Sequence, residues 1–277
     1  MTPIFYNLRQ SCDFDFPSYR KIPMFVRQAA RPLLTDFEPL KNVELITAHS
    51  IKYIVNVFSG KTPNGFGNTD PVLNETLRYT NANFLAATRH VAEKKAEVAC
   101  SATQGFHHAG FDSGGGYCTF NGLMIAALSS GAIKPALIFD GDGHYGDGTD
   151  DIIGALAVHD RVRHVTNMDM ESFVSRYKPN AHEWEVWASG LISSSKPSII
   201  MYQAGADAWI EDPYGAGYLS LEGMRNRDLG IFRAAKKSKI PLVWNLAGGY
   251  CKDVQRTVDV HIQTLRASDE VYYGGTR

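Results

Sequence analysis

One stretch decides the fold: Pro135-Ala-Leu-Ile-Phe-Asp140-Gly-Asp142-Gly-His144-Tyr-Gly-Asp147-Gly148. It begins as an apolar run typical of a buried strand and ends in acids and a histidine interleaved with glycine. Polar groups at the edge of a core cost free energy unless something satisfies them. A divalent metal ion is the simplest candidate. The competing interpretation is a solvated turn, because Asp-Gly pairs are common turn residues.

The spacing of the acids supports a metal site. If the backbone stays extended, residues 140, 142 and 144 share one face, because side chains in a strand alternate with period two. Asp142 and His144 could then bind one ion together, with Asp207 from the end of another strand as third ligand. Three protein ligands and one open position are typical of catalytic rather than structural zinc. Asp207 alone is a weak signal, since an Asp after a strand is more often a helix cap.

Strand and helix patterns alternate along most of the chain. We expect one α/β domain spanning residues 1–277, with a central parallel sheet and helices on both faces. Its ligands should bind beyond the carboxyl ends of the strands. Residues 43–47 fit a short strand or the start of a helix, and residues 1–42 are expected to wrap the core or shape the rim of a site. The expected strands are 97–101, 136–139, 162–166, 198–203 and 241–246, and the expected helices are 72–95, 120–128, 150–158, 221–237 and 252–267.

Composition narrows the class of protein. The 277 residues carry a net charge of −1 without a long basic run, which argues against a dedicated nucleic-acid surface. No apolar run approaches the 18–20 residues of a membrane span, and the N-terminus lacks a signal-peptide pattern. The four cysteines are widely spaced without a CxxC pair, so a reducing, cytoplasmic location fits best. The oligomeric state is left open.

Two further clusters come after expected strands. His107 and His108 come after a glycine, and a neutral histidine is the usual general base near neutral pH. Tyr250 comes after Gly248 and Gly249, beyond the last strand. In isolation, the histidines are better explained as surface or core residues, and Tyr250 could simply pack on the next helix.

Taken together, the motifs resemble the zinc-dependent histone deacetylase superfamily, which has the arginase/deacetylase fold and includes bacterial acetylpolyamine amidohydrolases and acetoin-utilisation proteins. The resemblance spans roughly residues 46–266. The motifs occur in the order His107-His108-Ala, Gly116-Tyr-Cys118-x-x-Asn121, Asp140-x-Asp142-x-His144-x-Gly-Asp147-Gly, Gly205-Ala-Asp207, Asp212-Pro-x-Gly, Arg227-Asp228 and Gly248-Gly-Tyr250.

The resemblance implies a metal centre. Asp142, His144 and Asp207 look like the zinc ligands. Iron(II) is an alternative to zinc, because nitrogen and oxygen ligands do not discriminate sharply between the two. Asp140 and Thr166 look like ligands of a structural monovalent cation, usually potassium in this family.

The resemblance also implies the proton-transfer groups. His108 looks like the general base that deprotonates the activated water and later protonates the leaving amine, and His107 looks like its electrostatic partner. Asp140 would orient His107 and Asp147 would orient His108, as carboxylates often orient functional histidines.

The remaining implied roles concern the substrate. Tyr250 looks like the hydroxyl donor to the carbonyl oxygen, Gly116 would present its carbonyl to the substrate amide, and Tyr117 stands where the family has a Phe lining the acyl-lysine tunnel. The stretch after Asp169 is short, and neither Phe173 nor Tyr177 aligns with the second tunnel aromatic. We therefore expect a more open site, or one completed by another subunit.

The function expected from the resemblance is removal of an acetyl or other acyl group from an amine, such as acetyl-lysine in proteins, an acetylpolyamine or a small acylated amide. A ureohydrolase-like two-metal enzyme would need more carboxylates, yet Trp209 stands two residues after Asp207. A non-catalytic relative that binds acyl-lysine or another ligand is the other alternative, and the presence of His108 and Tyr250 favours the active enzyme.

Overall fold

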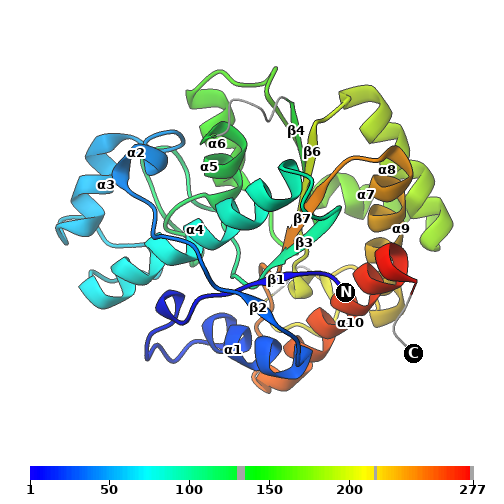
Figure 1. Ribbon diagram of the computed structural model, residues 1–277, viewed down its shortest axis with the longest axis horizontal. Helices are drawn as coiled ribbons and strands as arrows, with labels where there is room; N and C mark the ends of the chain where they lie inside the picture. The colour runs from blue at the N-terminus through cyan, green and yellow to red at the C-terminus, as the bar shows by residue number, and fades with distance from the viewer. Residues whose placement is uncertain (130–134, 215–216, 275–277) are drawn as a thin grey trace.

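A parallel sheet of seven strands forms the centre of the protein (Figure 1). The computed structural model describes residues 1–129, 135–214 and 217–274. In this part of the chain the strand order is β2-β1-β3-β7-β6-β4-β5. The strands are β1 Ile4–Phe5, β2 Leu33–Leu34, β3 Val98–Ser101, β4 Ala136–Asp140, β5 Val162–Val165, β6 Ile199–Gln203 and β7 Leu242–Asn245. Every pairing is parallel, which confirms the predicted α/β fold.

Helices cover both faces of the sheet because the strand residues alternate between two apolar cores. In β3, Val98 and Cys100 belong to one core and Ala99 to the other. The first core packs on α1 Pro17–Ala29, α7 Asn167–Tyr177, α8 Ala181–Ser195, α9 Leu221–Ser238 and α10 Val254–Tyr273. The second packs on α2 Asn42–Leu45, α3 Ile51–Phe58, α4 Pro71–Ala92, α5 Gly122–Ser129 and α6 Asp147–Ala155.

The N-terminal segment contributes to the sheet and not only to its surroundings. Ile4 of β1 pairs with Leu33 of β2 on one side and with Cys100 of β3 on the other. Residues 1–42 thus add two strands and helix α1 to the expected architecture. The ambiguous residues 43–47 begin as helix α2. The helix expected at 150–158 begins three residues earlier, at Asp147, because acids in its first turn suit the helix dipole.

The strand order places four functional strand ends side by side. Strands β3, β7, β6 and β4 are consecutive neighbours in the sheet. They lead respectively into His107 and His108, into Tyr250, into Asp207 and into Asp142. Parallel strands end at the same edge, so these segments meet there. No helix in the described ranges combines the length and apolarity needed to cross a membrane.

Candidate active site

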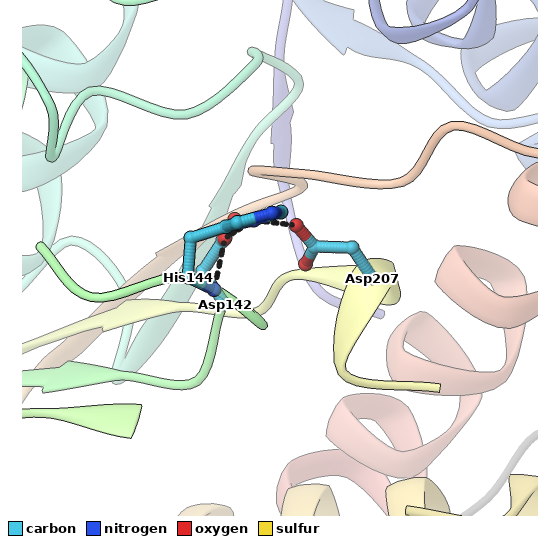
Figure 2. Close-up of side chains that lie close together, drawn as sticks. All are labelled: Asp142, His144 and Asp207. Carbon is cyan, nitrogen blue, oxygen red and sulfur yellow. Dashed lines mark hydrogen bonds and ion pairs between the residues drawn. The ribbon is translucent and has the colours of Figure 1, made fainter. Parts of the chain in front are cut away.

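Asp142, His144 and Asp207 converge from two loops at the carboxyl edge of the sheet. Asp142 and His144 lie just after β4, and Asp207 lies in a short 3-10 turn after β6 (Figure 2). Nδ1 of His144 lies 3.0 Å from Oδ2 of Asp207 and 3.3 Å from Oδ1 of Asp142. One ligating atom from each side chain falls within 4.8 Å of the others. Both carboxylates are buried, so their negative charge needs a cation.

The electrostatics of Asp142, His144 and Asp207, called the metal triad below because they could hold an ion, fit a divalent cation. Burial and the adjacent Asp142 raise the pKa of Asp207 to about 7. Hydrogen bonds with Asp142 and Asp207 raise the pKa of His144 to about 11. Two carboxylate oxygens and one imidazole nitrogen are a donor set that zinc and iron(II) accept.

Backbone groups hold the triad in place. The N–H of Gly143 donates to Oδ1 of Asp207 at 2.9 Å, and the N–H of Gly248 donates to Oδ2 of Asp142 at 2.8 Å. A Cβ at Gly248 would overlap the carboxylates of Asp142 and Asp207, so only glycine lets the β7 loop approach this closely. Nε2 of His144 donates to the carbonyl of Tyr214 at 2.7 Å, which leaves Nδ1 to face the two acids.

His107 and His108 stand side by side, each paired with a carboxylate. Nδ1 of His107 donates to Oδ2 of Asp140 at 2.7 Å, and Nδ1 of His108 donates to Oδ1 of Asp147 at 2.6 Å. The ring centroids are 4.1 Å apart. The environments differ: the side chain of Asp140 is buried, whereas that of Asp147 is 67% exposed.

This difference separates the proton affinities of the two histidines. Burial opposes the charged form of His107, but Asp140 and Asp142 outweigh it and raise the pKa of His107 to about 9. Burial and the charge of His107 lower the pKa of His108. Near neutral pH, His107 is therefore the protonated member and His108 the neutral one, able to accept a proton.

Tyr250 lies beside the triad on the loop after β7. Its ring centroid is 6.3 Å from that of His144 and 5.9 Å from that of Tyr117. Gly116 lies next to Tyr117 with a φ of +51°, and a Cβ there would overlap the ring of His108. The structure thus brings Tyr250, Tyr117 and Gly116 to the same edge as the metal triad and the histidine pair.

Known proteins resemble this chain in sequence. The family model described as histone deacetylase domain matches residues 20–165 and 166–265. The chain belongs to the histone deacetylase family. Histone deacetylase 2 of Arabidopsis thaliana is 24% identical over 269 residues, covering 82% of this chain and 66% of that protein. This chain therefore spans slightly under two thirds of that relative.

Solved structures show the same fold. The crystal structure of the HDA15 HD domain superposes with a TM-score of 0.76 at 17% identity and covers 96% of this chain and 90% of that one. An acetylpolyamine aminohydrolase from Burkholderia pseudomallei superposes with a TM-score of 0.73 at 14% identity, covering 98% and 99%. The predicted resemblance to the histone deacetylase superfamily is confirmed.

The two aromatic residues in the segment after Asp169, Phe173 and Tyr177, both lie on helix α7. Phe173 lies on α7 and stacks on Trp187 of α8, with ring centroids 5.2 Å apart. Tyr177 packs on Phe173 at 5.3 Å. Phe173 therefore stabilises the contact between α7 and α8, whereas Tyr177 is 58% exposed.

A buried histidine that no sequence signal marked, His164 of β5, lies on the far side of Asp140. Its Nε2 is 3.3 Å from Oδ2 of Asp140, and its Nδ1 is 2.8 Å from Oδ1 of Asp150. Burial opposes protonation, but the hydrogen bonds to the two acids raise the pKa of His164 to about 9. Asp140 is thus held between the two imidazoles of His107 and His164.

In the structure, the two predicted potassium ligands form hydrogen bonds with other side chains of the protein. Asp140 accepts from Nε2 of Gln203 at 3.0 Å on its other oxygen, Oδ1. Thr166 is the N-cap of α7, and its hydroxyl lies 3.0 Å from Oδ2 of Asp169. The potassium role of Asp140 and Thr166 therefore stays a prediction.

A buried lysine stabilises the loop after β7, which carries Tyr250 and is called the Tyr250 loop below. Lys21 of α1 is fully buried and donates to the carbonyl of Ala247 and, at 2.7 Å, to the carbonyl of Gly248. Its ammonium lies 5.9 Å from the centre of the Tyr250 ring. Burial lowers the pKa of Lys21 to about 8, although Asp207 and other nearby acids oppose that shift. A helix lysine is ordinarily expected on the surface, so the sequence carried no signal for this contact.

Residues of two family motifs stabilise loops of the site through hydrogen bonds. Asp212 accepts from the backbone N–H of Tyr250 at 2.6 Å and from that of Tyr214 at 3.1 Å, which joins two loops of the site. The glycine of its motif, Gly215, lies outside the described residues. Arg227 donates from Nη1 to the carbonyl of Gly141 at 2.7 Å and thereby supports the turn that carries Asp142.

Proposed function

We propose that this protein is a metal-dependent amide hydrolase that removes an acetyl or other acyl group from an amine. The observation that carries the proposal is the meeting, at one sheet edge, of the metal triad with a neutral histidine, a protonated histidine and a tyrosine. Membership of the histone deacetylase family supports the same reaction class. Amide hydrolysis requires activation of water, stabilisation of the oxyanion and protonation of the amine. The proposal assigns a group of the site to each of these tasks.

Asp142, His144 and Asp207 would hold the metal, which we propose to be zinc, with iron(II) as the alternative. The chemistry that a bound metal supplies is Lewis-acid polarisation of the amide carbonyl and acidification of a water molecule. The protein supplies ligand atoms for the metal that are fixed in position. Because backbone N–H groups from Gly143 and Gly248 orient the carboxylates, the site is organised before a substrate arrives.

His108 is the proposed general base. It accepts a proton from the water that attacks the acyl carbon, and then gives a proton to the amine nitrogen as the C–N bond breaks. The products are the free amine and the carboxylic acid. The lowered pKa of His108 supports this role, because the base must be neutral before the reaction begins. Asp147 holds Nδ1 of His108, so Nε2 is the atom that exchanges protons.

His107 and Tyr250 are the proposed stabilisers of developing charge. The protonated His107, held by Asp140, places a positive charge next to His108 and the triad. The hydroxyl of Tyr250 is the proposed donor to the carbonyl oxygen as it becomes an oxyanion. One such donor contributes roughly 3–4 kcal/mol in comparable sites.

The proposed substrates are acetyl-lysine in proteins, an acetylpolyamine or a small acylated amide, processed by one domain spanning residues 1–277. An alternative two-metal mechanism receives no support: among the described residues, the metal triad is the one group of three or more ligating side chains close enough to hold an ion.

A substrate panel with metal analysis tests the proposal. Protein loaded with zinc or iron(II) should release acetate from at least one acetylated amine and should lose this activity on chelation. If metal-loaded protein bound these amides without hydrolysing any of them, the non-catalytic relative would be the correct interpretation.

A further inference from the structure

Among the described residues, four N–H donors surround the buried carboxylate of Asp140. Its Oδ2 faces Nδ1 of His107 at 2.7 Å and Nε2 of His164 at 3.3 Å. Its Oδ1 accepts from Nε2 of Gln203 at 3.0 Å and from the backbone N–H of Asp142 at 3.3 Å. An ionised carboxylate offers about four lone-pair sites, so these contacts use all of them.

This arrangement does not fit the structural monovalent cation that the family resemblance implied at Asp140 and Thr166. A cation needs lone pairs that point at it, and those of Asp140 already point at N–H groups. Thr166 is also engaged, because it is the N-cap of α7. Its hydroxyl donates to Oδ2 of Asp169 at 3.0 Å and accepts from the backbone N–H of Asp169 at 3.4 Å.

His164 lies where an ion shared by those two residues would have to lie. Val165 of β5 pairs with Phe139 of β4, which sets Thr166 beside Asp140. The backbone is still extended at Thr166, so the side chains of His164 and Thr166 leave the chain on the same face. On that face the imidazole of His164 already contacts Asp140.

The imidazole of His164 is held on every side that the structure describes. Its side chain is only 2% exposed, and its Nδ1 lies 2.8 Å from Oδ1 of Asp150. The loop after β4 closes over the contact with Asp140. A Cβ built on Gly146 would lie 2.5 Å from Oδ2 of Asp140 and 2.9 Å from Cε1 of His164. Packing this close leaves no space for an ion between the two side chains.

We propose that His164 takes the place of a monovalent cation at Asp140, so that this chain orients His107 without bound potassium. His164 is a positioning residue: it holds Asp140, and Asp140 holds Nδ1 of His107. The inference goes beyond the proposed function, because it concerns what holds the site together and not what the site hydrolyses.

Thermal unfolding of zinc-loaded protein in potassium chloride and in tetramethylammonium chloride, at equal concentration, tests the inference. The Tm of the wild type should be the same in both salts. His164→Ser removes the ring and leaves an open position beside Asp140 and Thr166, so its Tm should be about 5 °C higher in the potassium salt. His164→Gln keeps an N–H donor that can reach Asp140, and this matched control should respond as the wild type does.

Crystals grown with rubidium, an ion that substitutes for potassium, locate any bound cation by anomalous scattering. Wild type and His164→Gln should show no rubidium beside Asp140, and His164→Ser should show one ion there. Rubidium beside Asp140 in the wild type would overturn the inference, and this result does not depend on whether His164→Ser folds. Equal responses of wild type and His164→Ser to potassium, with both stabilised or neither, would overturn it as well. Neither experiment measures hydrolysis, so these outcomes leave the proposed function intact.

Discussion

Nδ1 of His107 lies 2.7 Å from Oδ2 of Asp140, and both side chains are buried. This ion pair stands next to a histidine whose own carboxylate partner is largely exposed. The two neighbouring imidazoles therefore hold protons with different affinities, and near neutral pH the pair offers a positive charge and a free base.

Replacement of the proposed base should remove most turnover. His108→Gln should lower kcat by roughly 10² to 10⁴-fold, the range that a positioned acid–base group contributes. Metal content should stay unchanged, because His108 is not one of the triad. Asp147→Asn should cause a smaller loss, since that carboxylate faces solvent. Full turnover in His108→Gln, measured as acetate release, would exclude the assigned role.

Loss of the Tyr250 hydroxyl should reduce the stabilisation of the transition state more than it reduces the affinity for substrate. Tyr250→Phe should lower kcat by about 10² to 10³-fold with little change in KM, as expected for a donor to an oxyanion. Tyr214→Phe is a suitable control, because Tyr214 packs on Tyr250 at 5.4 Å but contacts His144 through its backbone carbonyl. Equal losses in the two variants would argue against a specific donor.

The metal triad should bind one divalent ion per chain. Asp207→Asn should weaken zinc binding at least about 100-fold, since the site has three protein ligands, and should abolish the rise in Tm that zinc gives to metal-free protein. Asp160→Asn, a change of the same kind at an exposed position, should bind zinc as the wild type does. Calorimetric titration measures the stoichiometry, and undiminished binding by Asp207→Asn would contradict the triad.

The buried His164 should make the stability of the metal-free protein depend on pH. Because the pKa of His164 is raised from 6.5 to about 9 by its acidic partners, its contribution is fully present below pH 6.5 and is lost as the pH rises through 9. His164→Gln should therefore destabilise the metal-free protein by up to about 3 kcal/mol more at pH 6 than at pH 9.5.

Urea unfolding of wild type and variant at both pH values isolates this effect, because other titrating groups, Lys21 among them, are common to both proteins. His159→Gln, at an exposed position, is the control. A difference between wild type and His164→Gln that does not change with pH would show that folding does not raise the pKa of His164.

The position of these side chains at strand ends could be predicted because those signals are local, whereas the family resemblance was needed to assign them to one site. Asp142 and His144 come after an apolar strand at period-two spacing, and Asp207 and Tyr250 come after strands of the same kind. Parallel strands bring the loops at their carboxyl ends to one edge of the sheet. The order β3-β7-β6-β4, which makes those ends neighbours, depends on long-range pairing that periodicity does not reveal.

Other parts of the fold and of the site depend on contacts that no local sequence pattern indicates. Strands β1 and β2 contain two residues each, too few for an alternating pattern. Lys21 resembles an ordinary residue of an amphipathic helix, and only the packing of α1 against the loop that carries Tyr250 gives it a role. His164 sits in a short strand where a polar side chain is expected to face solvent, yet it is enclosed by two acids.

The most direct test of the central claim is acetate release from acetyl-lysine peptides and acetylpolyamines by the same protein sample in three states: metal-loaded, chelated and reloaded. The account predicts activity in the first state, loss in the second and recovery in the third, with Asp207→Asn inactive throughout. Activity that survives chelation, or that Asp207→Asn retains, would contradict it.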